Sequence, residues 1–63
     1  MPLTKVKVKL IGEDGNSFAI IGTVRNALIK AGHKDLADEY RKKAMAGDYN
    51  NVLMTTMDYV EIR

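Results

Sequence analysis

Cysteine and tryptophan are absent from this 63-residue sequence, which has one histidine, one proline and one phenylalanine. Without cysteine, the chain forms neither disulfides nor thiolate metal sites, and this is compatible with a cytoplasmic protein. No apolar run approaches the roughly 18 residues that a membrane span needs. The early basic residue Lys5 is not followed by the apolar stretch of a signal peptide. We therefore expect a cytoplasmic protein without a membrane partner.

Length and charge narrow the class of protein further. A chain of 63 residues is expected to form one domain over residues 1–63, with a frayed start at residues 1–4. The hydrophobic fraction of 46% argues for a folded chain. Ten Lys and Arg face eight Asp and Glu, and a net charge of +2 is too balanced to imply a polyanion partner by itself.

Both ends of the sequence predict strands. Segment 5–11 (KVKVKLI) alternates apolar and basic residues, and this period of two is typical of a strand with one buried face. Its inner face would carry Val6, Val8 and Leu10, and its outer face Lys5, Lys7 and Lys9. Segment 57–63 (MDYVEIR) ends with the same period, placing Val60 and Ile62 inside and Tyr59, Glu61 and Arg63 outside. The two strands are expected to pair, with Glu61 beside the lysines.

A helix is predicted over residues 17–31, because apolar residues recur there at helical spacing. Asn16 or Ser17 would cap its start, and Gly32 would stop it. The alternative, in which residues 17–21 return as the second strand of a hairpin, stays open. Gly22 costs about 1 kcal/mol inside a helix, so we expect a neighbouring backbone to approach it closely.

Two more helices follow. The pattern over residues 33–47 predicts one that closes at Gly47, with Asp38 and Glu39 each facing a lysine four residues later. Asp48 would cap a short third helix. The predicted fold class is α+β: a small single domain in the order β-α-α-α-β, with the N- and C-terminal strands paired and packed on three short helices.

The segment 12–16 (GEDGN) is interpreted as a turn, because glycine, aspartate and asparagine all favour tight turns. A phosphate loop would require glycines that crowd backbone N–H groups around an anion, and the two acids between these glycines would repel a phosphate. Calcium would require a longer series of oxygen ligands. We expect no metal and no cofactor here.

The remaining candidates for chemistry have structural explanations. His33 follows a helix-stopping glycine and is expected in a solvated connection. Asp38 and Glu39 point about 100° apart on a helix and do not form an acid–base pair. Met45, Met54 and Met57 are expected to fill the core, although they would also suit an adaptable peptide groove. We expect no catalytic residue and no enzyme.

Basic residues give the one functional signal. Lys5, Lys7 and Lys9 share a strand face, and Tyr59 on the same face would offer a surface on which bases stack. Further basic residues follow on the helices: Arg25, Lys30, Arg41, Lys42 and Lys43. Acidic neighbours neutralise part of this charge, so a solvated surface is the favoured interpretation.

The sequence resembles a family of short uncharacterised proteins from bacterial genomes, plasmids and phages. The resemblance covers nearly the whole chain, and it rests on the turn at 12–16 with Phe18 after it, on Arg25, and on the segments 47–49 and 60–62. It implies a bacterial or phage origin and one compact domain, and no activity.

From these observations the sequence predicts a small non-enzymatic interaction module that binds a protein partner or associates with itself through a strand edge. The alternative is a weak nucleic-acid-binding protein that uses the lysines of the strand face and Tyr59.

Overall fold

The computed structural model describes residues 2–10 and 16–62, and its elements follow the order β1 (Lys7–Val8), α1 (Ser17–Lys30), α2 (Lys34–Ala44), α3 (Tyr49–Tyr59) and β2 (Glu61–Ile62). The α+β architecture is the predicted one. Residues 17–21 are helical, so the hairpin alternative is wrong. Apart from Asn16, the predicted turn at 12–16 lies outside the described residues.

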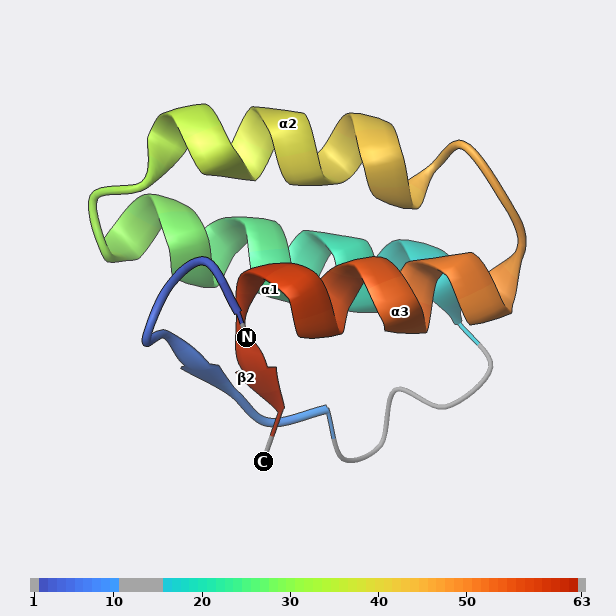
Figure 1. Ribbon diagram of the computed structural model, residues 1–63, viewed down its shortest axis with the longest axis horizontal. Helices are drawn as coiled ribbons and strands as arrows, with labels where there is room; N and C mark the ends of the chain where they lie inside the picture. The colour runs from blue at the N-terminus through green and yellow to red at the C-terminus, as the bar shows by residue number, and fades with distance from the viewer. Residues whose placement is uncertain (1, 11–15, 63) are drawn as a thin grey trace.

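The three helices form a bundle with the small sheet on one side of it (Figure 1). β1 packs beside α1 and β2 beside α3, while α2 packs on the other two helices away from the sheet. β1 and β2 are parallel, with Lys7 opposite Glu61 and Val8 opposite Ile62. A parallel pair requires a crossover connection, and the three helices provide it.

The ends of the helices follow local sequence signals. Asn16 Oδ1 accepts a hydrogen bond from Ala19 N at 3.1 Å, and an Asp48 carboxylate oxygen accepts one from Asn51 N at 3.0 Å, so both predicted caps are confirmed. Gly32 has a φ of 87°. This left-handed residue lets the His33 N–H bond the Leu28 carbonyl and ends α1 in a Schellman motif.

The core lies between the helices and beneath the sheet. Its best-buried large side chains are Tyr40, Tyr59, Ile20, Leu28, Val24 and Val60. Val8 is buried as predicted, and Val6 and Leu10 pack against the core. The predicted inner position of Ile62 is wrong, because this side chain is 41% exposed.

Three further expectations need correction. The C-terminal strand begins later than predicted, because α3 continues to Tyr59 and Val60 N still donates to the Thr56 carbonyl. The chain start is ordered at Leu3 and Thr4, whose backbone N–H groups donate to the carbonyls of Asp58 and Tyr59. A Cβ on Gly22 would meet nothing within 4 Å, so no other element among residues 2–10 and 16–62 brings its backbone close to that position.

Candidate interaction surfaces

One open hollow lies between β1 and α1 and has a volume of about 360 Å³. The strand contributes Lys7, Val8 and Lys9, and the helix contributes Thr23, Asn26, Ala27 and Lys30. The helical residues lie three or four positions apart, so they share the face of α1 that lies toward the strand. We call this surface the basic hollow, because three of its seven lining residues are lysines.

The lysine face of the N-terminal segment has the predicted arrangement. Lys5, Lys7 and Lys9 are exposed, whereas Val8 between the last two is buried. Glu61 is also exposed and lies opposite Lys7 in the sheet register, so charges of opposite sign are cross-strand neighbours as expected. Lys30 joins this surface from another element.

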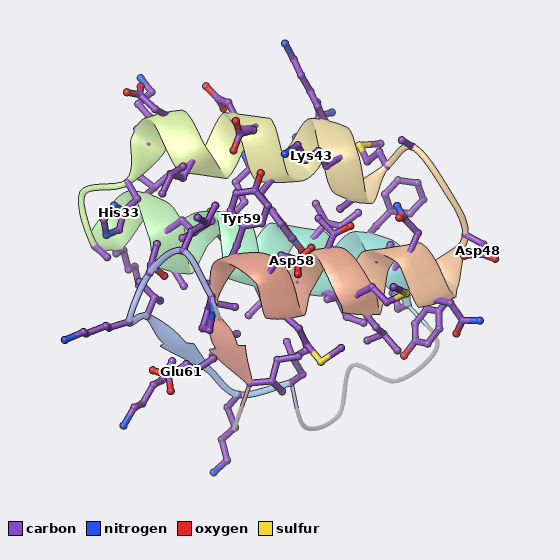
Figure 2. The ribbon with its side chains drawn as sticks, viewed as in Figure 1. His33, Lys43, Asp48, Asp58, Tyr59 and Glu61 are labelled. Atoms are coloured by element: carbon purple, nitrogen blue, oxygen red, sulfur yellow. The ribbon has the colours of Figure 1, made fainter. Side chains whose placement is uncertain are left out.

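Tyr59 does not belong to this surface, so the predicted outward position is wrong. Its side chain is 1% exposed, and it is the last residue of α3 rather than part of a strand. Figure 2 shows Tyr59 directed toward α2 and Lys43, whereas Glu61 lies at the sheet. The helix continues to residue 59 because that position buries a large aromatic ring, and the lysine face is left without a stacking partner.

Tyr59 instead joins a polar cluster between α2 and α3. Its hydroxyl donates to Glu39 Oε2 at 2.5 Å, and the Lys43 ammonium lies 5.7 Å from the centre of its ring. Burial, followed by the bond to Glu39, raises the pKa of the Tyr59 hydroxyl. The neighbouring Tyr59 also raises the pKa of the exposed Lys43. This cluster holds two helices together and keeps the phenol protonated.

A second buried polar pair lies deeper in the same interface. The hydroxyls of Tyr40 and Thr56 are 2.7 Å apart, and Thr56 Oγ1 donates to the Val52 carbonyl at 2.7 Å. Because the Thr56 proton is used by that carbonyl, Tyr40 must be the donor to Thr56. Both residues are fully buried, and every polar atom of the pair has a partner.

Apolar side chains form a different hollow at one end of the bundle, with a volume of about 250 Å³. Phe18 at the start of α1 lines it and is 76% exposed, and Met45 and Tyr49 also belong to its lining. The expected burial of the methionines in the core is wrong, because Met45, Met54 and Met57 are 44%, 64% and 54% exposed. Of the three, Met45 is the one that lines this hollow, which fits the alternative of an adaptable groove at that residue alone.

The single histidine and the paired acids are separate from one another. His33 precedes α2 and makes no side-chain capping bond. Asp38 forms a 3.4 Å ion pair with Arg25 rather than with the expected Lys42, and Glu39 accepts from Tyr59. No group of three His, Asp or Glu side chains within residues 2–10 and 16–62 is placed to hold a metal ion.

The sequence did not reveal that Lys30 lies near Lys7 and Lys9, or that Phe18 is exposed beside Met45. The position of Lys30 could have been detected, because the small or polar residues Thr23, Asn26 and Ala27 lie on one helical face that ends at Lys30. Thr23, Asn26 and Lys30 are polar and suit contact with a lysine-bearing strand, whereas Ala27 also packs against the core.

No family model, curated protein or solved structure matches this chain. The resemblance to short bacterial, plasmid and phage proteins therefore stays a prediction. None of the helices in the described part of the chain has the length and apolar character that crossing a bilayer requires.

Proposed function

We propose that this chain is a small non-enzymatic interaction module that engages another polypeptide through a free edge of its sheet. The observation that carries this proposal is the sheet itself, which has two strands and no third strand among the described residues. Each strand therefore has one outer edge whose backbone groups are open to a further strand. A cytoplasmic location belongs to the same proposal and rests on the cysteine-free sequence.

The positions of the titratable groups support the non-enzymatic part. His33 directly precedes α2. The Tyr59 hydroxyl donates a hydrogen bond to Glu39, and the pKa of this hydroxyl is raised. A general base must reach the proton of a bound substrate, and Tyr59 and Glu39 line neither the basic hollow nor the apolar hollow. His33 lines a separate open hollow of about 300 Å³, which within the described part of the chain is formed by the consecutive residues 32–36 alone.

Charge decides which edge suits self-association. Two copies that pair through β1 would bring their Lys5, Lys7 and Lys9 side chains together, and this repulsion opposes pairing. β2 carries Glu61 and the partly exposed Ile62. Glu61 N donates to the Val6 carbonyl, so the backbone groups of the next residue, Ile62, point to the outer edge. A two-fold contact would then place Ile62 against its copy.

Light scattering at increasing protein concentration tests this contact. The mass of the natural chain is expected to rise with concentration. The mass of the Ile62→Lys variant should stay that of a monomer, because two copies would bring their new lysine charges together at the paired edges. Met54→Lys is the matched control, since Met54 is an exposed apolar residue of α3. A strictly monomeric natural chain at every concentration would reject self-association.

The alternative function is weak binding of a nucleic-acid backbone. Its support is the group of lysines around the basic hollow together with exposed Lys5. Since Tyr59 is buried, the contacts would be with phosphates only, and the affinity should fall steeply with salt. Titration with single- and double-stranded oligonucleotides at low and high salt tests it, and absence of binding at low salt would remove this alternative.

A further inference from the structure

We propose that the free edge of β1 binds an extended acidic peptide in which acidic and apolar residues alternate. This inference deepens the proposed function, on which it rests, by assigning one edge and one partner chemistry. Three observations carry it: the direction of the Lys7 backbone groups, the charge of the basic hollow, and the pattern of the strand that already pairs with β1.

The backbone of β1 has a hydrogen-bonding side toward the basic hollow. Glu61 N donates to the Val6 carbonyl at 2.8 Å, so Val6 turns its carbonyl toward β2. Successive residues of a strand direct their backbone groups to opposite edges. The N–H and C=O of Lys7 therefore point to the outer edge, away from β2, and the hollow lined by Lys7 and α1 includes no residue of β2. An added strand would bond these two groups.

The basic hollow supplies the charge that selects the partner. Lys7, Lys9 and Lys30 line it, and none of them has an ion pair with another described residue. Exposed Lys5 extends the series along the same segment. Alternate residues of an extended chain lie about 6.6 Å apart on one face. Acidic residues at every second position of an added strand would match the spacing of Lys5, Lys7 and Lys9.

β2 is an internal precedent for this partner. Opposite Lys7 it presents the exposed acid Glu61, which is flanked by apolar Val60 and Ile62. This strand therefore pairs with the inner edge of β1 through an apolar–acidic–apolar pattern. At the outer edge of β1, Lys7 and Lys9 lie on one face of the strand. Val8 lies on the other face and lines the hollow together with Ala27 of α1. A peptide with the pattern of β2 fits both faces.

A second copy of the chain and a nucleic acid are the competing occupants. A second β1 would place lysines against lysines, which is unfavourable. A nucleic acid would satisfy the lysines but not the backbone groups of Lys7, because phosphates accept hydrogen bonds and leave the carbonyl without a donor. The acidic peptide is the occupant that satisfies charge and backbone together.

The test uses the full chain and capped fluorescent peptides, with binding followed by anisotropy. The probe is a repeating Val-Glu peptide. One control has the same composition with the glutamates grouped, and another is methylated on alternate backbone nitrogens, so that its side chains stay but its donors are lost. The alternating peptide is expected to bind at least about tenfold more tightly than either control, since each good cross-strand pair and backbone bond adds to the affinity.

Variants localise the site. Lys9→Gln with Lys30→Gln removes two positive charges from the hollow, and it should weaken binding of the Val-Glu peptide by about five- to tenfold. Lys34→Gln with Lys42→Gln makes the same charge change at exposed positions of α2 and should leave the affinity unchanged. Thermal melting of both double variants checks that the fold is retained.

Four outcomes overturn the inference: no binding of the Val-Glu peptide, equal binding of the grouped peptide, an equal loss in both double variants, or tighter binding of a single-stranded oligonucleotide. The proposed function has a separate readout. If the Val-Glu peptide does not bind but the mass of the chain still depends on concentration and on Ile62, only the proposal that β1 binds an acidic peptide is rejected. If both readouts fail, the strand-edge function falls as well.

Discussion

Tyr59 donates a hydrogen bond to Glu39 and thereby ties the last turn of α3 to the middle of α2. The same ring packs edge-on against Tyr40, with ring centres 5.5 Å apart and planes at 70°. Because Thr4 donates from both its N–H and its hydroxyl to the Tyr59 carbonyl, this residue also fixes the start of the chain. Helices, sheet and N-terminus therefore meet at Tyr59, and stability should respond to changes there.

Replacing Tyr59 with Phe should destabilise the fold by about 1 kcal/mol. The ring contact with Tyr40 is kept, and only the bond from the hydroxyl to Glu39 is lost. Glu39 is exposed, so water can replace the lost donor and the cost stays modest. Urea unfolding measures the change, and Tyr59→Ala, which removes the ring, should cost about 3 kcal/mol or more. Equal effects of the two substitutions would show that the ring contributes nothing.

Stability should fall as the pH rises above about 10. Burial raises the pKa of Tyr40 and of Tyr59 above the ordinary tyrosine value of 10.0. In this range the unfolded chain loses its phenolic protons before the folded chain does, so deprotonation favours unfolding. The contribution is complete below pH 10 and is lost as the pH passes through the raised values.

Urea unfolding at a series of alkaline pH values measures this loss. Tyr59→Phe should show a shallower decline than the natural chain, because one of the two shifted phenols is gone. Identical slopes for the two proteins would contradict the assignment of the decline to Tyr59.

Thr56→Val should cost about 1–3 kcal/mol, because it leaves the buried Tyr40 hydroxyl without an acceptor. Tyr40→Phe should cost less, since Thr56 keeps its bond to the Val52 carbonyl. The double substitution removes both polar partners, so its effect should be smaller than the sum of the two single ones. A double-mutant cycle by chemical denaturation measures the coupling, and simple additivity would mean that the two hydroxyls do not interact.

Gly22 within α1 and Gly32 just after it should respond in opposite directions to replacement by alanine. Gly22→Ala is expected to stabilise the fold by up to about 1 kcal/mol, because the added methyl meets open space inside a helix. Gly32→Ala should destabilise it by about 1 kcal/mol, since alanine is strained at a φ of 87°. Melting temperatures of the two variants decide the matter. A shift of the same sign in both would contradict these assignments.

The two helix starts after α1 should differ in sensitivity. Asp48→Ala removes the side chain that accepts from Asn51 N and should cost about 1 kcal/mol. His33→Ala at the start of α2 should change stability by less than about 0.5 kcal/mol, because His33 makes no side-chain capping bond. Chemical denaturation of both variants tests this, and a larger loss for His33→Ala would overturn the comparison.

Much of the helical structure was predictable, because its signals are local. The Asn16 and Asp48 caps and the Gly32 stop act on backbone groups within a few residues, and each operates as expected. The candidate site was predictable only in part. The lysine face followed from its period of two, whereas Lys30 joins it only when α1 packs beside β1.

The main error concerned the end of the chain, where a period-two pattern competed with a helix. Tyr59, Glu61 and Arg63 alternate with Val60 and Ile62, and this alternation favoured a strand with Tyr59 outside. Burying the Tyr59 ring between α2 and α3 instead extends the helix to residue 59 and leaves a two-residue strand. A short pattern cannot outweigh the burial of an aromatic side chain, which depends on Tyr40 and Glu39 far along the chain.

By itself, the sequence determined the class of fold, the order of its elements, the end of α1, the start of α3 and the lysine face of β1. These features depend on capping, on left-handed glycine and on the alternation of a strand, all of which act over a few residues. Only the tertiary structure decided that Tyr59 faces inward, that the strands run parallel, and that Lys30 completes a basic hollow with Lys7 and Lys9. Those outcomes depend on which distant surfaces pack together, because the free energy of burial is shared among elements that no local pattern connects.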